Sequence, residues 1–462
     1  MKIENTAIQD INGIINAQRE FFASNATLDI KFRKEQLKKL QNALMEWEKP
    51  LCEALWKDLH KSAEEAILTE LSIVAGEVKN HIKHMRSWMR SHHVATPLKM
   101  MPSRSRVVSE PLGNALIIAP WNYPVQLLLN PLVGAISSGC TAILKPSPYV
   151  PNVSKVIEDM ITATFDKRYI AVVQGNRIVN EVLLENRFDI IFFTGSPQLG
   201  KLVMNAAAKN LTPVVLELGG KSPCIIDKDA DIKVSAKRIA WGKTLNAGQT
   251  CIAPDYLLIH RSKIEQFVSE FAKAIRELHG NDIKQSRHYV RLVNDKAFER
   301  VKGYINDGNV VYGGNSDATE RFIEPTLLAD VPLTAPVMNE EIFGPVFPVI
   351  VLEGDFMEEA VKFVNEREKP LAFYYFGRES DGWECIRRTS SGGGCINDVI
   401  MHIANDRVPF GGVGNSGMGR YHGRESFDAF SHKRTIISTG TWIDLPFRYM
   451  PYKMFSLVKK LL

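Results

Sequence analysis

Two kinds of hydrophobic patterning divide the chain, and they predict helices first and a parallel sheet after them. Over residues 8–90 apolar side chains recur three and four positions apart with charged residues between them, which is the pattern of amphipathic helices. Beyond residue 111, short and largely uncharged runs alternate with helix-length segments. These runs predict strands at residues 115–119, 141–145, 170–174, 190–194 and 214–218.

This alternation indicates an α/β fold in which helices cover both faces of a parallel sheet. A second alternation of the same kind follows from about residue 220 and includes a helix expected at residues 264–278. Ligands in such folds bind at the carboxyl ends of the strands. We therefore expect functional side chains at those ends.

Residues 91–111 interrupt the pattern. They are polar and basic and contain Pro97 and Pro102, so they bury little apolar surface by themselves. We predict a linker, or an arm that pairs with another part of the chain.

Residues 114–144 contain no charged side chain and are long enough to cross a bilayer. However, Pro120, Pro124 and Pro131 would break the hydrogen bonding of a membrane helix, and asparagine is costly in lipid. We therefore expect a strand, a turn and a buried helix inside a protein core.

Length and composition add little beyond the class of protein. A chain of 462 residues is too long for one compact core, and 45% hydrophobic with 24% charged residues is typical of globular proteins. A net charge of +5 attracts anions weakly and makes no case for nucleic acid as a partner.

The six cysteines are scattered and form no Cys-x-x-Cys pair, and no histidine cluster has metal-ligand spacing. We expect reduced thiols and no metal site. The N-terminus lacks a signal-peptide pattern, so the predicted location is cytoplasmic.

The candidate chemistry centres on Glu217 and Cys251. Glu217 follows a β-branched run and precedes Gly219 and Gly220, so it lies at the tip of a buried strand. A partly buried glutamate has a raised pKa and is suited to act as a general base. Cys251 lies in an uncharged loop of small residues that a substrate can approach, which suits a thiol nucleophile. The alternative is an inert cysteine and a glutamate that bonds backbone amides.

Two further turns carry candidate groups. In the turn formed by residues 120–124, two prolines flank Asn122, whose amide can donate to a developing oxyanion or simply satisfy the turn. At residues 193–200 a strand runs into Gly195 and Ser196 before a helix, and a helix N-terminus binds anions such as pyrophosphate. Strand-glycine-helix turns are common, so this second signal is weak by itself.

Residues 412–417 match the dinucleotide-binding pattern G-x-G-x-x-G, but no βαβ unit surrounds them. We interpret them as a glycine-rich turn behind the active site, with Asn397 as a buried hydrogen-bonding support.

The strings ELGGKSP at residues 217–223 and GQTC at residues 248–251 resemble the two active-site signatures of the aldehyde dehydrogenase superfamily. The resemblance extends from about residue 10 to about residue 440, with its motifs in the same order. Residues 248–256 and 409–419 are most similar to the class 3 (fatty/aromatic) aldehyde dehydrogenases.

The resemblance implies a Rossmann-like parallel-sheet cofactor domain, an α/β catalytic domain and a small β oligomerisation arm that joins two copies into a homodimer. The corresponding ranges are residues 1–92 and 112–218 for the NAD(P)-binding domain, 219–430 for the catalytic domain, 93–111 and 431–440 for the arm, and 441–462 for a C-terminal tail.

The resemblance also implies the reaction, which is NAD(P)-dependent oxidation of an aldehyde to a carboxylic acid. Cys251 would attack the aldehyde, Asn122 and the Cys251 N–H would bind the oxyanion, and Glu217 would activate the water that hydrolyses the thioester. Class 3 membership suggests medium-chain aliphatic or aromatic aldehydes.

The matched motifs further imply a set of cofactor contacts, in which Lys145 bonds the adenosine ribose, Glu341 bonds the nicotinamide ribose and Phe343 packs beside it. The full set expected to contact NAD or NADP is Trp121, Lys145, Ser147, Gly195, Ser196, Gly200, Leu218, Glu341 and Phe343. Pro148 stands where the family commonly has a ribose-binding glutamate. The sequence therefore leaves both NAD and NADP open as the cofactor.

Residues 441–462 are aromatic and basic, which suits a segment at a membrane surface. Such a tail more often packs on its own subunit, and that is the expectation here. Two other functions compete with the dehydrogenase: a cofactor-free cysteine acyl-hydrolase, and a scaffold built on an inactive dehydrogenase fold.

Overall fold

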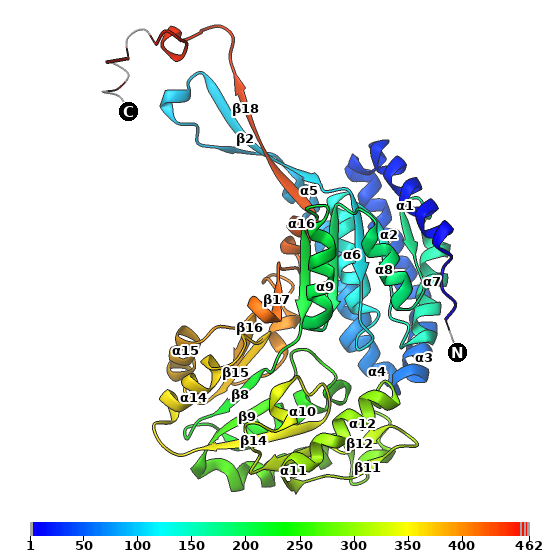
Figure 1. The fold of residues 1–462 in the computed structure, drawn as a ribbon, viewed down its shortest axis with the longest axis vertical. Helices are drawn as coiled ribbons and strands as arrows, with labels where there is room; N and C mark the ends of the chain where they lie inside the picture. The colour runs from blue at the N-terminus through cyan, green and yellow to red at the C-terminus, as the bar shows by residue number, and fades with distance from the viewer. Residues whose placement is uncertain (1–2, 453–454, 457–458, 460–462) are drawn as a thin grey trace.

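The computed structural model of the chain describes residues 3–452, 455–456 and 459. Two lobes, each built on a largely parallel sheet, lie next to each other, and a narrow β arm projects from the first lobe (Figure 1). This arrangement confirms the predicted α/β class with its small β arm.

The first lobe contains a six-stranded sheet in the order β17-β7-β6-β3-β4-β5, parallel except for β17. The five parallel strands fall within a residue or two of the predicted runs. The strands are β3 (Asn114–Ile118), β4 (Thr141–Lys145), β5 (Ile170–Val172), β6 (Ile190–Gly195), β7 (Val214–Leu218) and β17 (Gly417–Met418).

Helices cover both faces of this sheet, as the alternation predicted. In β3, Ala115 and Ile117 pack with α2, α5, α6 and α7, whereas Leu116 and Ile118 pack with α1, α8 and α9. The helices of the first lobe are α1 (Ile8–Ala23), α2 (Ile30–Glu46), α3 (Glu48–Leu59), α4 (Ala63–Ala66), the π-helix η2 (Ile67–Leu71), α5 (Ser72–Met89), α6 (Gln126–Ser138), α7 (Pro151–Thr164), α8 (Arg177–Glu185), α9 (Pro197–Ala208) and α16 (Arg424–Ala429).

Helix α6 confirms the interpretation of the uncharged stretch. Every residue of α6 is buried, with Pro131 inside the helix. Within the described part of the chain, no helix combines the length and the apolar character needed to cross a membrane.

The second lobe contains a seven-stranded sheet in the order β10-β13-β14-β9-β8-β15-β16, in which β10 alone runs antiparallel to its neighbour. The strands are β8 (Pro223–Ile226), β9 (Tyr256–His260), β10 (Asn309–Tyr312), β13 (Thr326–Ala329), β14 (Val346–Leu352), β15 (Ala372–Phe376) and β16 (Gly393–Ile396), with a separate ribbon of β11 (Ser316–Asp317) and β12 (Phe322–Ile323).

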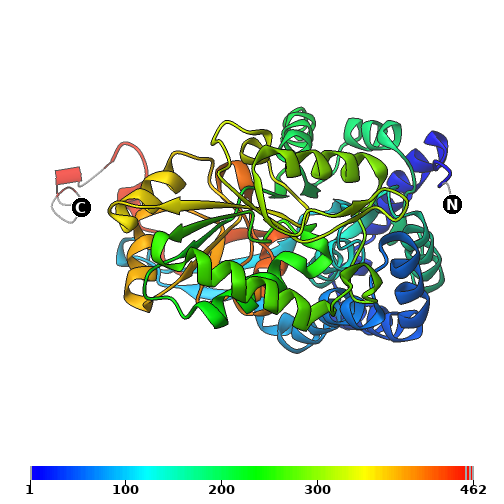
Figure 2. The same cartoon turned by 90° about the horizontal axis from the view of Figure 1, so that it is seen from below.

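Two groups of helices enclose the second sheet, α10 and α11 on one face and α12, α14 and α15 on the other (Figure 2). The core under α10 and α11 continues into the first lobe without a break. The helices are α10 (Ile232–Thr244), α11 (Ile264–His279), α12 (Asp295–Gly303), α13 (Pro336–Asn339), α14 (Phe356–Asn365) and α15 (Glu379–Arg388). Strand β17 and helix α16 come later in the chain than this lobe, yet they pack on the first lobe, against β7 and α6.

The arm is a three-stranded antiparallel sheet of β1 (His92–Val94), β2 (Ser103–Pro111) and β18 (Ser431–Thr439). Its register runs from Ser431 opposite Pro111 to Thr439 opposite Ser103, which confirms an arm in which residues 103–111 pair with a distant segment, while β1 pairs with β2 itself.

The described part of the C-terminal tail lies beyond the far end of the arm (Figure 1). It lines a hollow there with Met101 and Ile437, and Trp442 and Met450 are 77% and 78% exposed. This described part of the tail therefore lies at the arm tip and away from the lobes, because the arm carries it there. Lys453 and Lys460, which contribute to its basic character, lie outside the described residues.

Candidate active site

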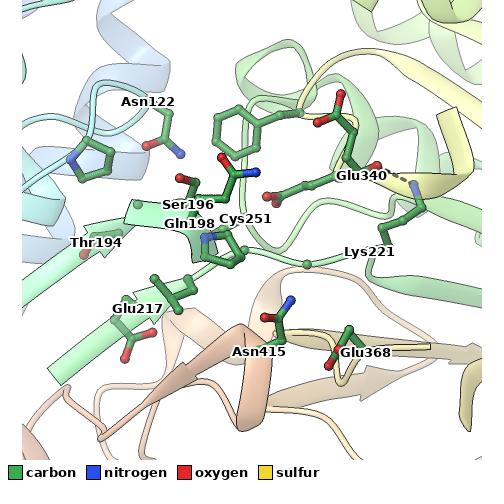
Figure 3. A pocket seen from close by; sticks show the side chains of 18 of the residues that line it. Asn122, Thr194, Ser196, Gln198, Glu217, Lys221, Cys251, Glu340, Glu368 and Asn415 are labelled. Atoms are coloured by element: carbon green, nitrogen blue, oxygen red, sulfur yellow. Dashed lines mark hydrogen bonds between the residues drawn. The ribbon is translucent and has the colours of Figure 1, made fainter. Parts of the chain in front are cut away.

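A cavity of about 590 Å³ lies where the carboxyl ends of the first sheet face the second lobe. Its lining comes from the loop after β3, the β6–α9 turn, the end of β7 and loops of the second lobe (Figure 3). The structure brings most of the predicted site residues to this lining: Trp121, Asn122, Gly195, Ser196, Glu217, Leu218, Cys251, Glu341 and Phe343.

Glu217 lies in strand β7 with its side chain 2% exposed. Neither carboxylate oxygen has a hydrogen-bond partner among the described residues, and burial raises the pKa of Glu217 well above its usual value. An unpartnered buried carboxyl that can gain and lose a proton meets the physical requirement for a general base.

The glycine-rich turn at residues 411–419 gives Glu217 its space. Gly417 in β17 pairs with Glu217 in β7, and a Cβ on Gly411 would lie 3.2 Å from Glu217 Oε1. The turn therefore lies behind this residue, as predicted. The expected support from Asn397 is wrong, because the half-buried Asn397 side chain pairs with the N–H and C=O of Gly377 at 3.0 Å each.

Cys251 is half-buried in the loop that follows the short helix η4 (Leu245–Gly248). Burial, and then the nearby carboxyls of Glu341 and Glu217, raise the pKa of its thiol. The same neighbours show that the nucleophile candidate and the base candidate share one electrostatic environment.

The loop before Cys251 has an unusual backbone. Asn246 and Ala247 both have φ of 52°, a region that costs a non-glycine residue about 1–2 kcal/mol. The loop is held in place by buried hydrogen bonds, including the Asn246 N–H to Glu65 Oε1 at 2.9 Å and the Gln249 side chain to the carbonyl of Arg291 at 3.1 Å.

Asn122 is 2% exposed and lies beside this loop. Its Nδ2 donates to the carbonyl of Gln249 at 3.0 Å, which uses one of the two amide hydrogens. The second amide hydrogen remains for a ligand that approaches Cys251.

The turn between β6 and α9 has the form expected of an anion site. Helix α9 begins at Pro197, and Ser196 caps it by accepting from the Leu199 N–H at 3.4 Å. The N-terminus of the helix, with Gly195 and Ser196, faces the cavity. Lys201, an exposed cation one turn into α9, also lines the cavity. This residue was not singled out from the sequence. The only signal for it in the sequence is its position four residues after Pro197, one helical turn into α9.

Lys145, Ser147 and Gly200 lie outside the cavity lining. The Lys145 ammonium is 1% exposed and donates to the carbonyl of Pro146 at 2.7 Å, and burial lowers its pKa to about 8. Ser147 accepts from the Tyr149 N–H. Gly200 lets α9 pack on β7, because a Cβ there would lie 2.7 Å from Leu218 Cδ2.

Glu341 and Phe343 reach the cavity from the second lobe. A side chain on Gly219 would collide with the Glu341 carboxylate, which explains the first glycine after β7, and a Cβ on Gly220 would lie 3.3 Å from Pro370 Cα. Burial raises the pKa of Glu341 to about 8, and its Oε1 has no partner among the described residues. The Phe343 ring meets Trp121 of the first lobe edge-on at 5.3 Å between centroids.

Lys221 and Asp255 position the loop that carries Glu341. The sequence did not reveal this role, although both residues lie in segments that carry the family resemblance. The Lys221 ammonium pairs with Asp255 and donates to the carbonyls of Val337 and Glu340 at 2.7 and 2.9 Å. Asp255 in turn accepts from the Ile342 N–H at 2.9 Å.

Comparison with known proteins agrees with the resemblance. Residues 1–436 match the model of the aldehyde dehydrogenase family. The chain is 46% identical over 438 residues to the 4,4'-diaponeurosporen-aldehyde dehydrogenase of Staphylococcus aureus, which covers 94% of this chain and 95% of that protein. It is 45% identical over 431 residues to the dimeric NADP-preferring aldehyde dehydrogenase of Rattus norvegicus, with 93% and 95% covered.

The fold is also shared with solved structures. A substrate-bound state of Staphylococcus aureus AldH superposes with a TM-score of 0.95 at 45% identity. That match covers 98% of this chain and 99% of the other.

Proposed function

This chain belongs to the aldehyde dehydrogenase family, and we propose from that membership and from the cavity that it oxidises an aldehyde through a thioester on Cys251. As a member of the family it is an NAD(P)-dependent oxidoreductase that converts aldehydes to acids. We assign each step of this oxidation to a residue of the cavity.

In the first step the Cys251 thiol gives up its proton to solvent, and the thiolate forms a bond to the aldehyde carbon while the C=O π electrons move to the oxygen. The oxyanion that results is bound by the free hydrogen of Asn122 Nδ2 and by the Cys251 N–H, two donors placed before the reaction begins. The former aldehyde carbon is then covalently bound to Cys251. The hydrogen on that carbon is therefore held in one orientation.

The dinucleotide, when bound, supplies the hydride acceptor. The chain offers groups that fit it: the open N-terminus of α9 for phosphates, and the unpartnered Oε1 of Glu341 for ribose hydroxyls. Trp121 and Phe343, one from each lobe, border the same space. The cofactor is NAD or NADP.

Loss of hydride and collapse of the oxyanion leave an acyl thioester on Cys251. Glu217 then removes a proton from water, the hydroxide adds to the thioester carbon, and the Cys251 thiolate leaves as the carboxylic acid forms. The high pKa of buried Glu217 makes it a strong base once it is ionised.

One observation carries this proposal: Cys251, Glu217 and Asn122 line the same cavity as Ser196 and Glu341, although they come from separate segments of the chain. A cofactor-free hydrolase would leave Ser196 and Glu341 without a task.

Replacing the nucleophile tests the proposal. Cys251→Ala should abolish formation of reduced nicotinamide, a loss of at least about 10³-fold, because no thioester can form. Dinucleotide binding, followed by protein fluorescence, should persist. Cys395→Ala, which removes the other half-buried cysteine, is the matched control and should keep wild-type turnover. Normal activity of Cys251→Ala would overturn the assignment.

A panel of short-chain, medium-chain and aromatic aldehydes, each assayed with NAD and with NADP, would define the substrate class. We propose apolar aldehydes as the preferred class, given the class 3 resemblance.

We also propose that the first lobe, formed by residues 1–92 and 112–218 with β17 and α16, binds the dinucleotide, and that residues 219–430 supply most of the catalytic lobe. The arm would join two copies into a homodimer. Six unpaired cysteines suit a reducing compartment, which supports the cytoplasm as the proposed location.

A further inference from the structure

We propose that the buried pair Lys61–Glu70 is a positioning device that fixes Asn122 for oxyanion binding. The inference rests on the oxyanion role proposed above for Asn122. Neither charged residue lines the cavity, and neither belongs to the motifs on which the family resemblance stands.

The pair lies in a fully enclosed place. The Lys61 ammonium is 2.6 Å from Glu70 Oε1, and both side chains are 0% exposed. Burying two opposite charges costs several kcal/mol per ion before their attraction is counted, and an apolar pair of similar volume is often as stable. Stability alone therefore does not account for these charges.

Each partner holds one side of the loop that carries Asn122. Lys61 Nζ donates to the Asn122 carbonyl at 3.1 Å. Glu70 Oε2 accepts from the N–H groups of Val125 and Gln126, at the start of α6, at 2.8 and 3.3 Å. The ion pair thus ties the backbone of the loop to the first turn of a buried helix.

Glu70 reaches this position from an irregular helix. It belongs to the π-helix η2 (Ile67–Leu71), which joins α4 to α5. π-Helical turns are rare, and they occur frequently at functional sites. The extra residue per turn redirects the side chains that follow. The distortion of this helix is a second observation that points to a functional demand on Glu70.

A third group completes the restraint on Asn122. Asn246 Nδ2 donates to the carbonyl of Asn122 at 2.9 Å and to that of Gln249 at 3.0 Å. The Asn122 carbonyl therefore accepts from both Lys61 and Asn246, while Asn122 Nδ2 is anchored on Gln249. Backbone and side chain are both fixed, so the remaining amide hydrogen has one direction.

Lys61 is also linked to the loop of the nucleophile through Tyr123. Lys61 Nζ lies 4.2 Å from the centre of the Tyr123 ring, and the Tyr123 hydroxyl bonds Thr250 Oγ1 at 2.7 Å. Thr250 directly precedes Cys251. Lys61 and Glu70 are thus placed to keep the amide donor and the thiol in register.

The decisive variant is Lys61→Met combined with Glu70→Gln, which removes both charges together while the Gln oxygen can still accept from α6. We expect the pre-steady-state burst of reduced nicotinamide to slow about 10- to 100-fold, because small displacements of a catalytic group have effects of that size. The affinity for NADP should not change. Glu70→Gln alone leaves the Lys61 ammonium buried without its carboxylate, so it should slow the burst in the same direction and also lower the melting temperature.

A double-mutant cycle with Asn122→Ala separates positioning from general structural damage. If the pair acts through Asn122, its removal should slow the Asn122→Ala enzyme by less than about 3-fold. A full multiplicative loss in that background, or a wild-type burst in the double variant, would overturn the inference. A wild-type burst in Asn122→Ala alone would instead refute the oxyanion role, which belongs to the proposed function.

Arg33→Met is the matched stability control. Arg33 is also a buried cation that donates to backbone carbonyls, those of Thr27 and Ser137, but it lies at the opposite end of α6. This variant should lower the melting temperature while leaving the burst rate unchanged.

Discussion

At the scale of single residues, the cavity concentrates carboxyl groups whose burial is unfavourable for folding. Glu217 is buried and Glu341 is half-buried, and both carry unpartnered oxygens and have raised pKa values. Groups that are costly to bury and that face a cavity are typical of functional sites. Their removal should therefore stabilise the fold as it damages the reaction.

Glu217→Gln tests this trade-off through pH. Burial raises the folded-state pKa of Glu217 above the unfolded value of about 4.3, so the folded protein binds this proton more tightly. The stability that the residue contributes is present below the unfolded pKa and is lost as pH rises through the folded pKa. We expect Glu217→Gln to raise the free energy of unfolding at pH 8 by about 1–2 kcal/mol.

Thermal melts at pH 5 and pH 8 measure the effect, and the advantage of Glu217→Gln should shrink at pH 5. Thioester hydrolysis should slow by at least about 10²-fold. Glu20→Gln, at an exposed position, should show no pH-dependent advantage. An equal stabilisation at both pH values would argue against a buried titrating carboxyl.

Pro148 offers a second test at this scale. It is half-buried just beyond β4, at the position where the family resemblance implies a ribose-binding glutamate. Pro148→Glu should lower the ratio of kcat/KM for NADP over NAD by about 10-fold, because a carboxylate repels a 2'-phosphate and accepts from ribose hydroxyls. Pro148→Gln has similar length without the charge and should change the ratio less. An unchanged ratio in Pro148→Glu would show that another residue discriminates the ribose.

At the scale of elements, the arm is the part of the protein whose structure depends least on the lobes. Strands β2 and β18 are long, and β18 is almost entirely exposed, with Ile436 and Ile437 39% and 43% exposed. A narrow ribbon of this kind is marginal in water unless it packs against something else. Its exposed apolar residues support the proposal that it joins two copies of the chain.

Ile437→Lys tests the proposed homodimer. Burying a lysine in place of isoleucine at a subunit contact should weaken dimerisation by about 2 kcal/mol, or about 30-fold in Kd. Sedimentation analysis of each protein over a series of dilutions measures this change in the Kd of dimerisation. Leu211→Lys replaces a residue that is 91% exposed on the first lobe, and it should leave association unchanged. A monomeric wild-type protein would contradict the proposal directly.

At the scale of the whole molecule, the active site exists because two sheets meet. The parallel strands of the first lobe deliver Asn122, Ser196 and Glu217 at their carboxyl ends, and the second lobe adds Cys251 and Glu341. Trp121 of the first lobe contacts Phe343 of the second lobe, which connects the two lobes across the cavity. Short strand β17, returning from late in the chain, completes the first sheet behind Glu217.

The sequence alone determined the features that depend on local pattern. Strands buried on both faces must be apolar throughout, so 141–145 and 214–218 were placed to the residue. The uncharged stretch that contains buried α6 was distinguished from a membrane span by Pro120, Pro124 and Pro131. Glu217 and Cys251 could be singled out because glycines and small residues surround them, and a reacting group needs that space.

Only the tertiary structure decided which distant groups meet. In the folded chain the Lys145 side chain lies in the core, and residues 103–111 pair in a defined register with 431–439. Lys61 and Asn246 both donate to the carbonyl of Asn122. None of these contacts leaves a periodic signal, because a hydrogen bond between remote segments depends on how whole layers pack. Local burial is encoded in short windows of residues, whereas the geometry of a site is a property of the assembled fold.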